Sequence, residues 1–164
     1  MDTKISRARA FADKAHANQC RKFTDEPYIS HPAAVAQLVL SVPHTTAMVA
    51  AAWLHDVVED TSICLAEIEA EFGAEVASLV EQLTDVSRPE DGNRAARKAV
   101  DRDHTAQSSP EAQTIKLADI IDNTRSVVER DPVFAKTYLK EKALSIEVLS
   151  AGDPFLRAMA ATLI

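Results

Sequence analysis

The sequence predicts an all-α protein with a single domain over residues 1–164, and three features of the chain support this prediction. Only 3 residues are glycine, and aromatic residues make up 5% of the chain. Alanine, leucine and glutamate, which favour helices, recur throughout. Apolar residues return every three or four positions, the period of a helix with one buried face. The length is enough for one sizeable hydrophobic core.

The spacing predicts the helices in order. The first is expected over residues 5–18. The second opens at Ser30-His31-Pro32, with the proline at the first helical position and His31 as the N-cap residue. The third is expected to run unbroken over residues 45–60, with an apolar body that is buried on most sides. Further helices are expected over residues 63–72, 74–84, part of 85–109, 110 to about 130, 131–149 and 155–164.

Composition excludes several classes of function. The net charge of −7 argues against a nucleic-acid surface, although a local basic cluster still permits a small phosphorylated ligand. No apolar run approaches the ~20 residues needed to span a bilayer. Cys20 and Cys64 lack zinc-type spacing, and we expect reduced, buried thiols in a cytoplasmic protein. The oligomeric state is left open.

The end of the third helix concentrates metal-ligand and acid–base side chains. His55, Asp56, Glu59 and Asp60 follow an apolar run that starts at Ala51. Because residues four apart share a helix face, Glu59 lies one turn after His55, and Asp60 one turn after Asp56. A buried carboxylate is costly unless it has a partner, and a metal ion resolves that cost. The alternative is an exposed, solvated helix end. The first interpretation is a metal-dependent hydrolytic site.

Other candidate residues have two interpretations each. His31 suits capping as well as metal binding, and His16 is a histidine near a helix end rather than a ligand. Asp119 and Asn123 lie one turn apart on an apolar helix, so both are expected to face a polar partner. Further cations suit a solvated surface as well as phosphate binding: Arg21 and Lys22 in a loop, and the helical stripe of Arg94, Arg97, Lys98 and Arg102.

Several motifs in order resemble one known family. They are Arg21-Lys22, Pro27-Tyr28-Ile29-x-His31-Pro32, Leu54-His55-Asp56-Val57-Val58-Glu59-Asp60-Thr61, Phe72-Gly73 and Lys116-Leu117-Ala118-Asp119-x-x-x-Asn123. Together they resemble the HD phosphohydrolase superfamily, which has an all-helical fold and binds divalent metal. Within it, the chain is similar to the hydrolase domain of RelA/SpoT proteins over roughly residues 7–130. By its length it looks like a free-standing small alarmone hydrolase.

The resemblance implies a role for each matching residue. It implies one metal ion, usually Mn²⁺, with His31, His55, Asp56 and Asp119 as ligands. Glu59 and Asp60 match the pair that orients and deprotonates water. Arg21 matches a residue that stacks on the purine, and four further residues match or lie near substrate contacts: Lys22, Arg94, Asn123 and Tyr138. Thr24-Asp25-Glu26 lacks the glycine common in the family loop, which leaves the pocket shape and base preference open.

The expected function is therefore metal-dependent removal of the 3′-pyrophosphate from guanosine or adenosine alarmones, (p)ppGpp or (p)ppApp. Two histidines and two carboxylates form the mixed nitrogen and oxygen set that suits Mn²⁺. One alternative is an HD-type phosphatase of other nucleotides, such as dNMP or NADPH. Another is a nucleotide-sensing module without catalysis, which has no need to retain Glu59 and Asp60. The expected partner is a small nucleotide, with no nucleic acid and no membrane.

Overall fold

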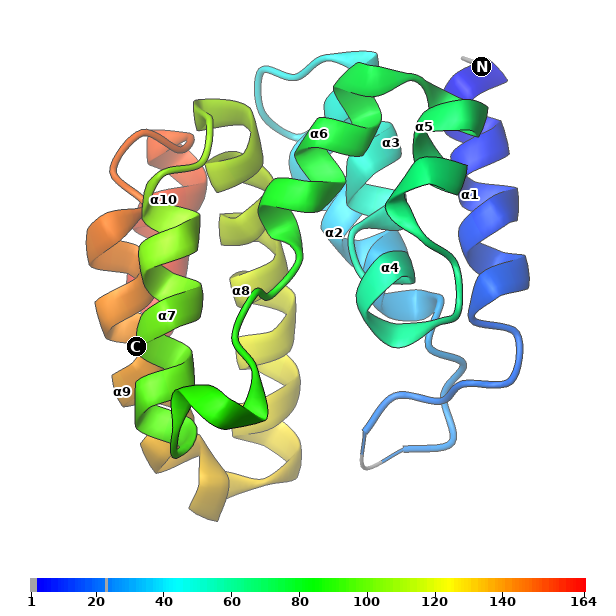
Figure 1. The fold of residues 1–164 in the computed structure, drawn as a ribbon. Helices are drawn as coiled ribbons and strands as arrows, with labels where there is room; N and C mark the ends of the chain where they lie inside the picture. Colours follow the sequence, from blue (N-terminus) through cyan, green and yellow to red (C-terminus); the bar gives the residue numbers. More distant parts are fainter. Residues whose placement is uncertain (1–2, 23) are drawn as a thin grey trace. The chain divides into compact units, whose positions relative to one another are not determined.

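The computed structural model describes residues 3–22 and 24–164, and helices dominate this part of the chain (Figure 1). Across these residues no strand forms, and Cys20 and Pro27 make an isolated antiparallel bridge. The all-α prediction is confirmed. The chain divides into two compact units, residues 1–84 and 85–164, and the expectation of a single domain stays a prediction. In the described ranges, none of the helices is both long and apolar enough to cross a membrane.

The N-terminal unit packs its helices around α3 (Thr46–Leu54). Its other helices are α1 (Thr3–Ala15), α2 (Ser30–Leu40), α4 (Val57–Asp60), α5 (Leu65–Phe72) and α6 (Ala74–Leu83). Every residue of α3 from Ala47 to Leu54 is buried, and α3 contacts α1, α2 and α6. Because four of the nine residues of this helix are alanine, the three neighbouring helices pack closely on it. The predicted burial of this segment on most sides is confirmed.

The C-terminal unit is built on α8 (Pro110–Arg130), which packs against α9 (Pro132–Val148) and α10 (Pro154–Thr162). It also contains the short helix η1 (Pro89–Asp91) and α7 (Arg94–Ala106). The helix starts follow the sequence signals, since Ser109, Asp131 and Asp153 each cap a helix whose first position is proline. Ile115, Leu117, Ala118, Ile120 and Ile121 are buried, as predicted for this central helix.

Three local predictions are wrong. The helix expected over residues 45–60 is interrupted at His55 and Asp56 and resumes as α4. His31 is not an N-cap, because α2 already begins at Ser30, after turn hydrogen bonds from Ser30 N–H to Pro27 and from His31 N–H to Tyr28. Cys20 and Cys64 are exposed rather than buried, and both are free thiols. Cys64 occupies the exposed N-cap of α5, where its N–H donates to Glu67.

Candidate metal centre and active site

His31 enters the site from the first turn of α2. Its side chain is 1% exposed, and Pro32 follows it. Proline is tolerated in the first turn because the N–H groups there have no partner within the helix. A buried imidazole is therefore fixed at a helix start, where its ring faces the ring of His55 at a centroid distance of 5.2 Å.

His55 lies at the interruption between α3 and α4, and its side chain contacts the last turn of α3. The ring nitrogen Nδ1 lies 2.8 Å from the carbonyl oxygen of Ala52. An unbroken helix would offer this oxygen to the N–H of Asp56. Since a carbonyl oxygen only accepts, Nδ1 carries the proton, and Nε2 is the nitrogen left to bind a ligand.

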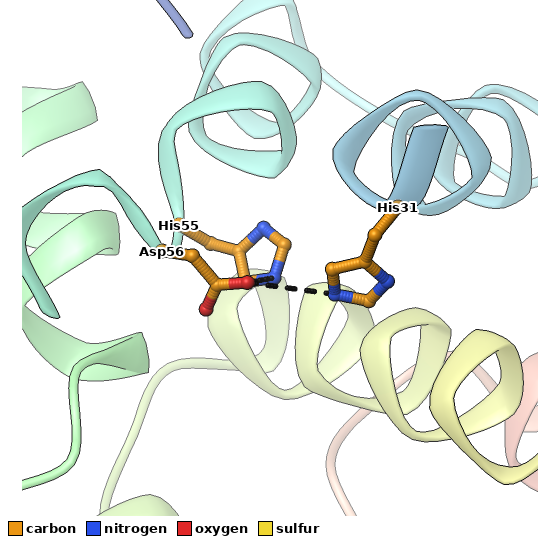
Figure 2. Close-up of side chains that lie close together, drawn as sticks. All are labelled: His31, His55 and Asp56. Carbon is orange, nitrogen blue, oxygen red and sulfur yellow. Dashed lines mark ion pairs between the residues drawn. The ribbon is translucent and has the colours of Figure 1, made fainter. Parts of the chain in front are cut away.

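His31, His55 and Asp56 form a compact cluster of metal-binding atoms (Figure 2). One ligand atom from each residue lies within 4.8 Å of the other two. Asp56 Oδ2 is 3.0 Å from His55 Nε2 and 3.5 Å from His31 Nε2. Both histidines are buried, and the Asp56 side chain is 19% exposed. The atoms of all three residues converge on one point inside the N-terminal unit.

The chemistry of this cluster fits a divalent metal ion. With Nδ1 of His55 protonated, Nε2 directs a lone pair at a carboxylate oxygen 3.0 Å away. Two electron-rich atoms at this distance repel each other unless a positive charge lies between them. The backbone carbonyl that fixes the His55 tautomer is also the usual outer partner of a metal-binding histidine. Two imidazoles and a carboxylate are a donor set that first-row divalent ions accept.

Tyr28 and His16 support the cluster from the preceding segment. The Tyr28 hydroxyl donates to Asp56 Oδ2 at 2.5 Å, and its ring lies 4.8 Å from the buried ring of His16. His16 Nδ1 is 2.8 Å from Gln19 Oε1, and Gln19 Nε2 donates to the carbonyl oxygen of Asp60 at 2.9 Å. His16 thus lies just beyond α1, as a buried part of this network.

Glu59 and Asp60 occupy the single turn of α4, directly after the cluster. The Asp60 N–H donates to the carbonyl oxygen of Asp56 at 2.9 Å, so these two residues keep the one-turn spacing. Partial burial, followed by the negative charge of Asp56, raises the pKa of Asp60 above its usual range. A carboxyl group with a raised pKa exchanges protons more readily near neutral pH.

Arg21 and Lys22 lie in the loop between α1 and α2. Backbone hydrogen bonds close this loop, from Arg21 N–H to Glu26 at 2.8 Å and from Tyr28 N–H to Gln19 at 2.9 Å. The two cations therefore extend from a loop whose two ends are held together by backbone hydrogen bonds. Lys22 is exposed and Arg21 is partly buried.

Asp119 and Asn123 lie in the C-terminal unit and face each other, as their spacing predicts. Asn123 Nδ2 donates to Asp119 Oδ1 at 2.7 Å, and Lys116 Nζ lies 3.1 Å from Asp119 Oδ2. Asp119 is 7% exposed. This carboxylate has partners on α8 itself, and its proposed role as a metal ligand stays a prediction.

Arg94 and Tyr138 also belong to the C-terminal unit. Arg94 donates to both carboxylate oxygens of Glu141, at 2.7 and 2.9 Å, and lies over the ring of Phe134. Tyr138 is buried on α9, and burial together with the charge of Asp119 raises the pKa of its hydroxyl. A substrate phosphate at Arg94 would have to compete with Glu141.

Sequence reasoning gave no role to Tyr28, Gln19 or His16. Tyr28 lies three residues before His31, and that spacing alone does not indicate a hydrogen bond to Asp56. His16 was assigned to a helix end because it follows an amphipathic segment. His16 and Gln19 are three residues apart, a spacing that brings two polar side chains together. This spacing was the one feature of the sequence that could have indicated their hydrogen bond.

An all-helical fold with a buried cluster of histidine and carboxylate ligands defines a class of metal-binding helical proteins. Comparison with protein families identifies which family of helical metal-binding proteins this is. The chain belongs to the HD domain family, whose model matches residues 8–146. His31, His55, Asp56 and Asp119 all lie within the matched range.

Three similar proteins illustrate the relationship. A probable guanosine-3′,5′-bis(diphosphate) 3′-pyrophosphohydrolase of Synechocystis is 55% identical over 84 residues, which cover 51% of this chain. The human guanosine-3′,5′-bis(diphosphate) 3′-pyrophosphohydrolase MESH1 is 40% identical over 123 residues, covering 73% of this chain and 67% of MESH1. A solved metazoan ortholog of SpoT, described as hydrolysing ppGpp, aligns with a TM-score of 0.88 at 27% identity, over 99% of this chain and 94% of that one.

The relatives differ greatly in length. The alignment covers 11% of the Synechocystis protein and 16% of a probable GTP pyrophosphokinase of Mycobacterium leprae. This chain therefore corresponds to a small part of those two proteins and to most of the animal proteins.

Proposed function

We propose that this protein is a metal-dependent 3′-pyrophosphohydrolase of nucleotide alarmones. It would remove pyrophosphate from the 3′ position of ppGpp or ppApp and leave the 5′-nucleotide. The main support for this proposal is the geometry of His55. Its Nδ1 is hydrogen-bonded to the carbonyl oxygen of Ala52, and its Nε2 lies 3.0 Å from Asp56 Oδ2. The bacterial and animal relatives, which are named as 3′-pyrophosphohydrolases, support the same activity.

The proposed metal ion is Mn²⁺, held by His31, His55 and Asp56, with Asp119 as the fourth ligand. A divalent ion would lower the pKa of a bound water to about 7 in favourable sites, and it would neutralise phosphoryl charge. The protein's own contribution is to fix the ligands. Ala52 sets the tautomer of His55, and Tyr28 holds one oxygen of Asp56.

Glu59 and Asp60 are the proposed proton-handling residues. The turn of α4 places both directly after the ligands His55 and Asp56. Gln19 holds the backbone of Asp60, so the end of this short helix is tied to the segment after α1. The raised pKa of Asp60 suits a group that takes a proton from water and returns it to the leaving oxygen.

The proposed substrate contacts are Arg21, Lys22, Asn123, Arg94 and Tyr138. Arg21 would stack on the purine through its planar guanidinium, and Lys22 would meet phosphate. Asn123 would contact the ribose or the base. For Arg94, substrate phosphate would replace Glu141 as the partner of the guanidinium. Either guanine or adenine can stack on Arg21, so comparing turnover of ppGpp with that of ppApp decides which base is preferred.

Substitution of the two acids tests the proposal. We expect Glu59→Gln and Asp60→Asn each to lower kcat for ppGpp by about 100-fold or more, since a positioned acid or base contributes about 10²–10⁴ in rate. Metal content, measured by elemental analysis, should stay near that of the unaltered protein. Glu69→Gln, an exposed change on α5, is the matched control and should retain full turnover.

Three results would contradict the proposal. Full turnover in either acid variant with metal bound would exclude the assigned proton roles. Orthophosphate release from dNMP or NADPH, with ppGpp and ppApp left intact, would replace the pyrophosphohydrolase with a phosphatase of other nucleotides. Binding of ppGpp without any turnover by metal-loaded protein would indicate a sensor.

A further inference from the structure

A charged cavity lies within the C-terminal unit, between α7, α8 and α9. Its volume is about 60 Å³, and its cationic lining residues are Lys98, Arg102, Lys116 and Lys142. A buried water needs about 10–15 Å³ of such space. The cavity is therefore several times larger than one water requires, and large enough for a small polyatomic ion.

The acidic residues around this cavity already have partners. Asp85 Oδ2 lies 3.2 Å from Lys98 Nζ, and Asp101 accepts hydrogen bonds from the N–H groups of Val86 and Ser87. Glu141 accepts hydrogen bonds from Nε and Nη2 of Arg94, whose side chain is not part of the lining. Because these carboxylates are engaged, they leave part of the positive lining without a counter-charge.

Lys142 and Arg102 are the cations left over. In the described part of the chain, no carboxylate lies within ion-pair distance of either side chain. The Lys142 ammonium lies over the ring of Tyr138, 5.2 Å from its centroid. Burial, and then the nearby charge of Lys116, lower the pKa of Lys142 to about 8. A half-buried ammonium group without a carboxylate partner gains from a bound anion.

The lining also offers hydroxyl groups. Thr105 Oγ1 donates to the carbonyl oxygen of Asp101 at 2.9 Å, and Ser145 Oγ donates to that of Glu141 at 3.2 Å. Both hydroxyls line the cavity and can turn toward an oxygen ligand. Cationic and hydroxyl donors together favour a phosphate-type oxyanion over chloride, since each oxygen of such an anion accepts a separate hydrogen bond.

We propose that this cavity is a binding site for a phosphate-type oxyanion, with Lys142 and Arg102 as its principal charge partners. The anion is either a free ion, such as phosphate or pyrophosphate, or a phosphate group of the nucleotide substrate. The site is defined by residues of the C-terminal unit alone and does not require the proposed catalytic activity.

The test measures binding of inorganic phosphate and pyrophosphate to the full-length, metal-free protein by isothermal titration calorimetry, at constant ionic strength in chloride. We expect Lys142→Met to weaken binding at least 10-fold, and Arg102→Met to weaken it several-fold. Lys140→Met, an exposed change two residues away on α9, is the matched control and should bind like the unaltered protein.

Stability separates loss of the site from loss of the fold. Because Lys142 is a half-buried cation without a carboxylate partner, Lys142→Met should not lower the thermal midpoint in phosphate-free buffer. The proposal is overturned if neither anion binds the unaltered protein, or if Lys142→Met binds both with unchanged affinity.

Kinetics then identify the source of the anion. If pyrophosphate inhibits ppGpp turnover competitively and Lys142→Met raises KM, the cavity holds a phosphate group of the substrate. If inhibition is non-competitive and KM is unchanged, the cavity is a separate site for the free ion. Both results retain the oxyanion site, and because binding is measured without metal, an inactive protein would not affect the test.

Discussion

The tautomer of one histidine organises the proposed metal centre. His55 Nδ1 donates to the carbonyl oxygen of Ala52, which directs Nε2 toward Asp56, and this bond lies where α3 ends. The end of α3 and the orientation of His55 as a proposed metal ligand therefore occur at the same residue. Tyr28 then restrains the carboxylate that faces this nitrogen.

Tyr28→Phe tests this restraint. The change removes only the hydroxyl that donates to Asp56 Oδ2. We expect Mn²⁺ affinity to fall by about 10–100-fold, as is common when an outer partner of a metal ligand is lost. Competition with a metal-sensitive dye measures the affinity, and circular dichroism checks the helices. Unchanged affinity would show that Tyr28 has no part in orienting Asp56.

Among the secondary-structure elements, the sequence predicted most helices but missed the interruption between α3 and α4 at His55 and Asp56. Apolar spacing located α8, because its pattern is long and its burial follows the helical period. The interruption at His55 coincides with a hydrogen bond between its side chain and a backbone carbonyl, and periodicity carries no signal for such a bond. The start of α2 was misplaced by two residues, because hydrogen bonds of residues 27–31 begin the helix at Ser30, before Pro32.

The candidate site was predictable to a similar degree. The ligand types and their order along the chain identified His31, His55 and Asp56, and the structure brings these three together. Exposure of the cysteines was not predictable, because their position at a cap and in a loop depends on tertiary packing. The roles of Glu59, Asp60 and the substrate contacts stay predictions, as does a cytoplasmic location.

Asp101 is a structural carboxylate that joins α7 to the preceding loop. Burial alone would raise its pKa, but hydrogen bonds from Ser87 and Val86 and the charge of Lys98 lower the pKa on balance. We expect Asp101→Asn to reduce the free energy of unfolding by about 1–3 kcal/mol, because Asn offers fewer acceptors and no charge. Denaturant unfolding at pH 7 measures this difference.

The same residue predicts a pH dependence. A carboxyl group with a lower pKa in the folded protein stabilises the fold above its unfolded pKa of about 3.9, and this contribution is lost as the pH falls further. The difference in stability between the unaltered protein and Asp101→Asn should therefore shrink below about pH 4. A difference that is constant down to pH 2.5 would contradict the ionised role of Asp101.

For the whole molecule, metal binding should appear as stability. An ion that binds only the folded protein stabilises it by about 2.7 kcal/mol at 100 times its Kd. For a chain of this size that corresponds to a rise in Tm of roughly 5–10 °C, which calorimetry with and without Mn²⁺ can measure. His55→Ala should abolish the rise, whereas His44→Ala, an exposed histidine of the same unit, should preserve it. An equal rise in both variants would place the ion elsewhere.

Product identification tests the central claim most directly. Mn²⁺-loaded protein is incubated with ppGpp and, separately, with ppApp, and the quenched reactions are resolved by anion-exchange chromatography. The account predicts pyrophosphate together with GDP or ADP, in equal amounts and only when metal is present. Intact substrates, or orthophosphate as the first product, from protein with demonstrably bound metal would contradict it.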